Sequence, residues 1–227
     1  MRAAHYCQEC GKVQPPAPVD YFTFFGLPLK LNLDTAQLEL DFYALSRKLH
    51  PDINARADAP EQEWSLEKTS QLNDAYRTLK DPISRTEYLL RLQGVQLEEQ
   101  SKAATEEARK SGSAKKQVVP PDLLEQVFEL NMQLEEFRMN KKMGEDDPAL
   151  VRDLHEAKRH LVSKQTEMLS ELSAAWNQWD ALVDRAAAGE AVADSERAAI
   201  RDKMLAILNR RTYLRNLLRE VDEVLES

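Results

Sequence analysis

Residue types that could do chemistry gather at two places, the tripeptide His50-Pro51-Asp52 and the pair Cys7 and Cys10. An imidazole beside a carboxylate could transfer protons near neutral pH, but catalysis also needs a pocket and a convergent partner. Cys7-Gln8-Glu9-Cys10-Gly11 has the spacing of half a zinc site, whereas structural zinc takes four ligands. His5 is a third candidate ligand and nothing nearby supplies a fourth. We therefore expect no enzyme activity, no cofactor and no zinc held by a single chain, and we expect the cysteines to lie in a mobile tail.

The tripeptide separates two helical patterns. Apolar residues recur at spacings of three and four on each side of it, which predicts two amphipathic helices. Pro51 fixes its own φ and pushes His50 out of the helical region, so the first helix should end there. The tripeptide is thus expected on an exposed loop at the tip of an antiparallel hairpin. The residues that carry the two patterns are Leu38, Phe42, Leu45 and Leu49, then Leu72, Ala75, Tyr76 and Leu79.

Local signals place further helices around this hairpin. Residues 21–28 read as a short aromatic helix closed by Gly26. Asp34 is a predicted N-cap, with Gln37 reaching back to it. Asp81-Pro82 should end the second arm and start another helix, which runs to Gly94.

Composition places the chain among ordinary helical proteins. It has 227 residues, 42% of them hydrophobic, and a net charge of -8. That charge argues against nucleic-acid binding and against a membrane surface. No apolar run approaches the roughly 20 residues of a membrane span, and the first residues lack a signal-peptide pattern. Two cysteines form no disulfide framework, so we expect a bacterial cytoplasmic protein.

The chain is predicted to be all-α, in two domains. Residues 1–19 are the tail, 20–94 the helical hairpin domain, 95–119 a linker rich in Glu, Lys, Ala and Ser, and 120–227 a three-helix bundle. Gly144 and Gly189 should separate the three helices of this bundle. The apolar seams of these helices include Leu123, Val127, Leu130, Leu134, Phe137, Leu154, Leu161, Trp176, Trp179, Ile207, Leu214 and Val221.

The first domain resembles a J-domain, and its details resemble the HscB/Jac-type co-chaperones of iron–sulfur cluster assembly. The resemblance rests on residues 21–28, on Leu33-Asp34, and on the segments 72–76 and 85–90. It covers residues 20 to 93 through specific motifs and residues 121 to 226 more loosely. Longer members of this family carry two Cys-x-x-Cys pairs before the J-domain, and this chain matches only the second of them.

The resemblance implies two protein partners. The J-domain would bind a DnaK/HscA-type chaperone ATPase and stimulate its ATP hydrolysis, and the bundle would deliver an IscU-type iron–sulfur scaffold protein as client. The residues implied in binding the ATPase are His50, Pro51, Asp52, Arg47 and Lys48. The basic face is thin, since Glu39 and Asp41 lie on the same helix.

The helix after residue 120 carries a second apolar stripe beside its seam. At 100° per residue, Leu124, Phe128, Met132 and Met139 lie about 100° to 180° around from the seam. Such a stripe marks either a partner site or packing under a neighbouring helix or the J-domain. By resemblance, scaffold binding falls on Leu124, Glu125, Phe128, Glu129, Met132, Glu136 and Tyr213, with Glu125 and Met132 departing from the usual residue types. Tyr213 is expected off the seam of the last helix, completing the patch.

Two alternatives stay open at this point. One is a J-domain protein that serves a different client, and the other is a structural helical protein with an accidental tripeptide. Stimulation of a chaperone ATPase would exclude the second, and capture of the scaffold protein would exclude the first.

Overall fold

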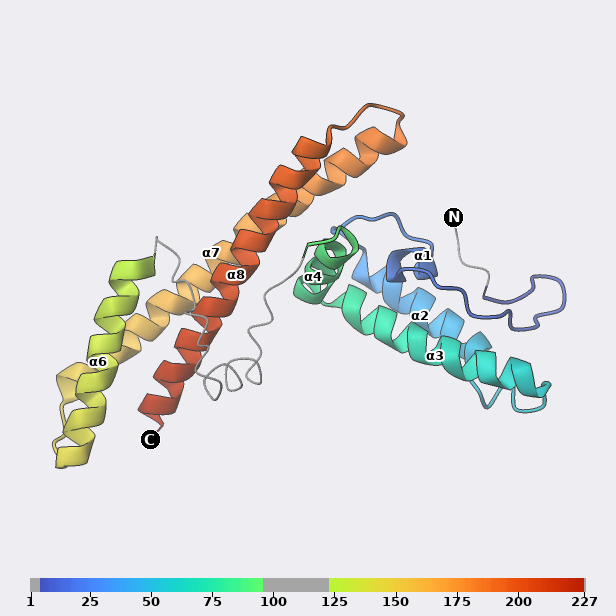
Figure 1. The fold of residues 1–227 in the computed structure, drawn as a ribbon. Helices are drawn as coiled ribbons and strands as arrows, with labels where there is room; N and C mark the ends of the chain where they lie inside the picture. Colours follow the sequence, from blue (N-terminus) through green and yellow to red (C-terminus); the bar gives the residue numbers. More distant parts are fainter. Residues whose placement is uncertain (1–4, 96–122, 227) are drawn as a thin grey trace. The chain divides into compact units, whose positions relative to one another are not determined.

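The computed structural model describes residues 5–95 and 123–226 and confirms the all-α fold (Figure 1). The described part contains no β-strand, only an isolated antiparallel bridge between Tyr6 and Val13. None of its helices combines the length and the apolar character that a membrane span requires. The predicted linker, residues 95–119, lies outside the described residues except for Val95. The helices are α1 (Tyr21–Phe25), α2 (Thr35–Leu49), α3 (Ala59–Lys80), α4 (Pro82–Leu92), α6 (Leu124–Met143), α7 (Pro148–Ala187) and α8 (Asp194–Leu225).

The chain divides into two compact units, and two helices contribute to both. One unit combines residues 1–97 with residues 175–201, which are the end of α7 and the start of α8. The other combines residues 98–174 with 202–227. Each unit is described separately below.

In the first unit, short polar side chains set the ends of the helices. Asp34 caps α2 by accepting hydrogen bonds from the N–H groups of Ala36 and Gln37, both at 3.0 Å. The Gln37 side chain donates to Asp41 instead of reaching back, so the predicted reciprocal cap is not formed. Gly26 closes α1 at φ 69°, a left-handed conformation that favours glycine.

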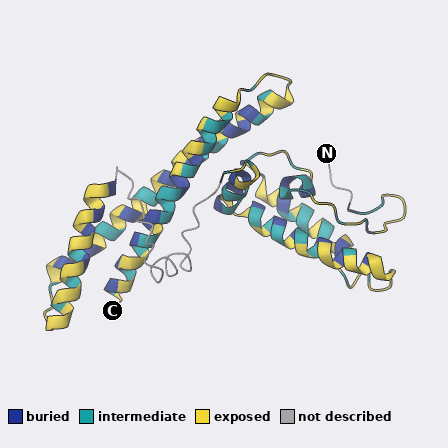
Figure 2. Cartoon of the chain, in the orientation of Figure 1, coloured by how far each residue is buried: buried dark blue, intermediate teal, exposed yellow. Residues whose placement is uncertain are grey.

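The core of this unit lies between α1, α2, α3 and α4, where buried positions recur along one side of each helix (Figure 2). Aromatic rings link the elements: Tyr21 stacks on Tyr88 at 4.4 Å, and Phe42 stacks on Tyr76 at 4.2 Å between ring centroids. The fully buried apolar side chains include Phe22, Leu31, Leu49, Leu72, Leu79, Leu89 and Leu90.

The N-terminal segment packs on this hairpin, which corrects the expectation of a mobile tail. His5 is buried, with its Nε2 2.8 Å from the carbonyl oxygen of Phe24. Val13 is fully buried, and its N–H donates to a carboxylate oxygen of Glu61 at 2.8 Å. Lys12 forms an ion pair with Asp58 at 2.9 Å. The sequence suggested a tail because the partners of these residues lie far away in the sequence and no local pattern indicates them.

The end of α7 also belongs to this unit, and its contacts account for the two tryptophans of this helix. The indole N–H of Trp176 donates to the Thr86 hydroxyl at 2.9 Å, and that of Trp179 donates to the carbonyl of Leu29 at 2.8 Å. Trp179 is buried as predicted. Its partner, however, lies in the loop after α1, whereas the sequence pattern predicted packing within the bundle.

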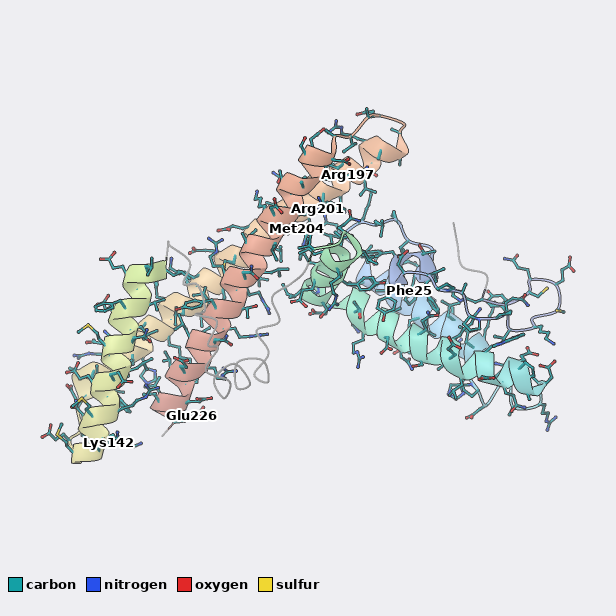
Figure 3. The ribbon with its side chains drawn as sticks, viewed as in Figure 1. Phe25, Lys142, Arg197, Arg201, Met204 and Glu226 are labelled. Atoms are coloured by element: carbon teal, nitrogen blue, oxygen red, sulfur yellow. The ribbon has the colours of Figure 1, made fainter. Side chains whose placement is uncertain are left out.

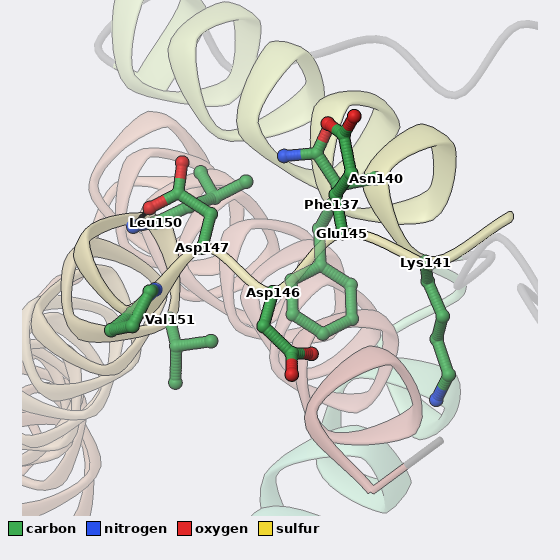
Figure 4. Close-up of a pocket in the computed structure, with 9 residues that line it drawn as sticks. Phe137, Asn140, Lys141, Glu145, Asp146, Asp147, Leu150 and Val151 are labelled. Carbon is green, nitrogen blue, oxygen red and sulfur yellow. Dashed lines mark hydrogen bonds between the residues drawn. The ribbon is translucent and has the colours of Figure 1, made fainter. Parts of the chain in front are cut away.

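The second unit is built from α6, the first part of α7 and the remainder of α8. Of the seam predicted for α6, Leu123, Val127, Leu130 and Leu134 are buried, whereas Phe137 is half-buried. Gly144 ends α6 at φ 73°. Asp147 caps α7 by accepting hydrogen bonds from the N–H groups of Ala149 and Leu150. This turn leaves a hollow of about 450 Å³, whose lining includes Phe137, Asn140, Lys141, Glu145, Asp146, Leu150 and Val151 (Figure 4).

Candidate interaction site

The His-Pro-Asp tripeptide lies where it was predicted, immediately after the last residue of α2. His50 is extended, at φ -62° and ψ 133°, and its N–H donates to Ser46 O at 3.0 Å. Pro51 cannot continue the helix, because it has no N–H to donate. The loop therefore leaves the hairpin at its tip and presents His50 and Asp52 to solvent, with side chains 48% and 89% exposed.

The His50 ring is oriented by a hydrogen bond from the backbone of Asp52. The Asp52 N–H donates to His50 Nδ1 at 3.2 Å, while an Asp52 carboxylate oxygen lies 3.7 Å from the same nitrogen. Since Nδ1 acts as an acceptor, the neutral imidazole carries its proton on Nε2. The pair thus offers a partner a ring N–H and an exposed carboxylate.

Three polar residues outside the tripeptide hold the loop in place. Ser65 and Thr69 on α3 donate their hydroxyls to the carbonyl of Leu49, at 2.6 and 2.9 Å. The Asn54 amide donates to the carbonyls of Lys48 and His50, at 3.1 and 3.0 Å. Sequence reasoning missed all three. Ser65 and Thr69 could have been noticed, because each is a small hydroxylic residue at a position that the helical pattern turns toward the core.

The cationic residues before the tripeptide are both exposed but differ in their contacts. Arg47 has no ion pair recorded within residues 5–95 and 123–226. Lys48 donates to the Tyr6 hydroxyl at 2.8 Å and lies 4.1 Å from the centroid of the Tyr6 ring. Glu39, an acidic residue of the same helix, is paired elsewhere: Tyr76 and Lys80 donate hydrogen bonds to its carboxylate. These hydrogen bonds lower the pKa of the Glu39 carboxyl.

The cysteine pair forms a tight turn of its own. The Cys7 N–H donates to Lys12 O at 2.8 Å, and the Gly11 N–H donates to Cys7 O at 3.0 Å. Hydrogen bonds from the backbone of Cys10 and Glu9 lower the pKa of the Cys7 thiol. His5 packs on Phe24 in the core, and the described residues contain no cluster of three or more metal-ligating side chains.

The second apolar stripe of α6 lies on the surface of its unit. Leu124, Phe128, Met132 and Met139 are 54%, 69%, 60% and 59% exposed. The acidic residues expected to border the stripe, Glu125, Glu129 and Glu136, are also exposed. Tyr213 differs: it is 8% exposed, so the expectation that it lies off the seam of α8 is wrong, and burial raises the pKa of its phenol.

Comparison with known proteins agrees with this geometry. A model of the DnaJ domain matches residues 20–88, which include α1, α2, the loop, α3 and part of α4. The chain carries a DnaJ domain. The tripeptide is the loop of this domain, between its two long helices.

Curated relatives extend the resemblance within the same region. The co-chaperone protein HscB homologs of two Vibrio cholerae O1 strains, classical Ogawa 395 and M66-2, are 44% and 43% identical over 79 residues. Each match covers 35% of this chain and 46% of the relative. The match thus spans just under half the length of these relatives, and the resemblance to HscB-type co-chaperones rests on the DnaJ domain.

Solved structures resemble a larger part of the chain. The crystal structure of human co-chaperone protein HscB has a TM-score of 0.63 at 23% identity, covering 98% of this chain and 91% of that one. At that identity the likeness shows the fold alone. The chaperone HscB from Vibrio cholerae has a TM-score of 0.54 at 26% identity, with 92% and 98% covered.

Proposed function

We propose that this protein is a J-domain co-chaperone that stimulates ATP hydrolysis by a DnaK/HscA-type chaperone. The main support for the proposal is the tip of the α2–α3 hairpin, where the side chains of His50 and Asp52 are exposed. Hydrogen bonds from Asn54, Ser65 and Thr69 hold this loop in place. A rigid loop binds at a lower entropic cost than a flexible one. Arg47 and Lys48, on the last turn of α2, add positive charge beside the tripeptide.

The test is the rate of ATP hydrolysis by such a chaperone with increasing amounts of this protein. His50→Gln and Asp52→Asn should abolish the stimulation and leave the melting temperature nearly unchanged, because exposed substitutions cost less than about 0.5 kcal/mol. Glu67→Gln, an exposed position on α3, is the matched control and should stimulate like the parent. Stimulation by either loop variant at the parental level would refute the assignment.

We also propose that the second unit carries an IscU-type iron–sulfur scaffold protein, so that the co-chaperone delivers this client to the ATPase. The support is the exposed stripe of α6 with its acidic border, because an apolar strip rimmed by charge is typical of a partner surface. The residues assigned to it are Leu124, Glu125, Phe128, Glu129, Met132 and Glu136. Tyr213 stays a prediction as a contact, and its burial requires that it act through packing beneath the surface.

The scaffold surface can be tested without the ATPase. Phe128→Ala should weaken binding of the purified scaffold at least about tenfold, since truncation of a central aromatic anchor commonly costs about 2 kcal/mol or more. Val162→Ala, which truncates an exposed apolar residue on α7, is the control. Stimulation of the ATPase without scaffold should be unaffected. Unchanged affinity in a folded Phe128→Ala, Met132→Ala variant would contradict this surface, and stimulation without scaffold binding would indicate a different client.

A further inference from the structure

The first unit contains an apolar pocket that neither proposed partner uses. It has a volume of about 300 Å³, at the lower end of the range for small-molecule sites. Its walls come from the loop after α1, the last turns of α7, the end of α4 and the first turn of α8. The residues that line it are Pro28, Leu29, Gln93, Trp179, Leu182, Val183, Ala186 and Arg197.

Almost all of this lining is apolar, and Arg197 is its one charged residue. The indole N–H of Trp179 is already bonded to the Leu29 carbonyl at 2.8 Å, so the ring offers the pocket only apolar surface. Gln93 and Arg197 are left as the polar groups that a ligand could engage. A pocket of this kind selects a molecule with an apolar body and one polar end.

Three acidic residues between positions 184 and 196 pair with cations other than Arg197. On α7, Asp184 pairs with Lys30 at 2.6 Å. Glu190 and Glu196 both pair with Arg185, at 3.2 and 2.8 Å. Over the described residues, no hydrogen bond or ion pair of the Arg197 guanidinium is recorded, although it is half-buried at the pocket.

A second arginine stands one turn further along α8 (Figure 3). Arg201 donates from Nη1 to the carbonyl of Gln93 at 3.1 Å, so it is fixed against a residue that lines the pocket. Its Nε is buried and has no hydrogen-bond partner. The side of the pocket formed by α8 and the end of α4 is therefore positively charged and has N–H donors to spare.

We infer that this pocket binds a small amphipathic monocarboxylate, with its alkyl chain against Trp179 and Leu182 and its carboxylate on Arg197. The planar guanidinium presents two parallel N–H donors, which match the two oxygens of a carboxylate. Octanoate is a suitable probe, because it combines one carboxylate with an unbranched chain of moderate volume. The inference is independent of the proposed co-chaperone function, since no residue of the tripeptide or of α6 takes part.

The test is titration of the full-length protein with octanoate, followed by tryptophan fluorescence and by calorimetry. We expect one site per chain with a Kd of about 0.1 to 1 mM, as for a ligand of this size. 1-Octanol, which lacks the charge, should bind at least about fivefold more weakly, and acetate, which lacks the chain, should show no saturable binding.

Three variants make the test specific. Arg197→Gln should weaken octanoate binding at least about fivefold and leave 1-octanol binding unchanged, while Arg215→Gln, an exposed arginine further along α8, should change neither. Ala186→Phe adds a ring at an exposed helical position on the pocket wall, and should abolish both ligands without loss of helix content.

The inference is overturned if octanoate shows no saturable binding. It is equally overturned if 1-octanol binds as well as octanoate, or if Arg197→Gln and Arg215→Gln behave alike. His50→Gln should bind octanoate like the parent, so failure of the co-chaperone assignment would leave this result unchanged.

Discussion

Asp180 is a side chain whose loss should strongly destabilise the first unit. It lies near the end of α7, is 8% exposed, and accepts three hydrogen bonds from the segment before α2. The donors are the N–H of Leu31 at 2.7 Å, the N–H of Asn32 at 2.9 Å, and the side-chain amide of Asn32 at 2.8 Å. Asp180→Ala removes all three hydrogen bonds at once.

The expected cost follows from the charge of the acceptor and from the burial of Leu31. Hydrogen bonds to a charged group contribute about 1.5 to 3 kcal/mol each, and a buried donor left without a partner carries its full desolvation penalty. Leu31 is fully buried, so water cannot easily replace the carboxylate at its N–H. Adjacent hydrogen bonds are not additive, and we expect a total loss of about 3 to 5 kcal/mol in the free energy of unfolding.

A nearby cation adds to the effect. Arg85 is buried, and desolvation lowers the pKa of its guanidinium, which the negative charges of Asp81 and Asp180 partly oppose. Removing Asp180 leaves this cation with less compensation. The Asp180→Asn variant, which keeps one acceptor oxygen but no charge, should therefore lie between the parent and Asp180→Ala in stability.

The assay is urea unfolding followed by tryptophan fluorescence, which reports on Trp64, Trp176 and Trp179, all three in the first unit. Asp184→Ala is the matched control: one turn further along α7, it breaks an ion pair with Lys30 that also reaches this segment. The Asp184 side chain is 64% exposed, so its loss should cost less than about 1 kcal/mol. If Asp180→Ala is no more destabilising than Asp184→Ala, the carboxylate does not hold the two parts of the unit together.

Three further predictions concern single groups. Burial lowers the pKa of Lys68 from 10.5 to about 8, so the folded state binds fewer protons than the unfolded state between these values. The free energy of unfolding should therefore rise from pH 8 to pH 10.5, by up to about 3 kcal/mol, and Lys68→Met should flatten this rise in urea titrations; equal slopes would contradict it. The rate at which iodoacetamide alkylates Cys7 should rise with pH at a lower apparent pKa in the folded protein than in urea, because the turn stabilises the Cys7 thiolate. Mass spectrometry of the alkylated peptide at a series of pH values measures this rate. Leu134→Ala, at a position 1% exposed in the α6 seam, should cost about 2 to 5 kcal/mol in urea unfolding followed by far-UV circular dichroism, whereas Met139→Ala on the exposed stripe should cost little.

Where local chemistry decides the structure, the sequence was sufficient. Pro51 ends α2 after Leu49, Asp34 and Asp81 cap their helices, and Gly26 and Gly144 adopt the left-handed conformation expected of them. The exposed stripe of α6 also follows from the helical period alone. Each of these features depends on residues within a few positions of one another.

Contacts between segments far apart in the sequence could not be predicted from helical periodicity. Trp179 reads as one more apolar position in a near-heptad series, and nothing in that series says that its indole N–H bonds to Leu29, 150 residues away. The same holds for Val13 and Glu61, whose hydrogen bond fixes a segment that composition describes as a tail. Tyr213 was misplaced because a helical period with scatter leaves positions at the edge of a seam undecided.

The discontinuity of the first unit has a consequence for protein synthesis. Its first part ends at Leu97, and its second part, residues 175–201, is made only after about a hundred further residues have been added. At about 5 to 20 residues per second, a ribosome needs about 5 to 20 s for this stretch. During that interval the N–H groups of Leu31 and Asn32 lack Asp180, and the segment around Leu29 lacks Trp179. The first unit thus stays incomplete until its last helical turns have been made, long after residues 20–88, the DnaJ domain, have been synthesised.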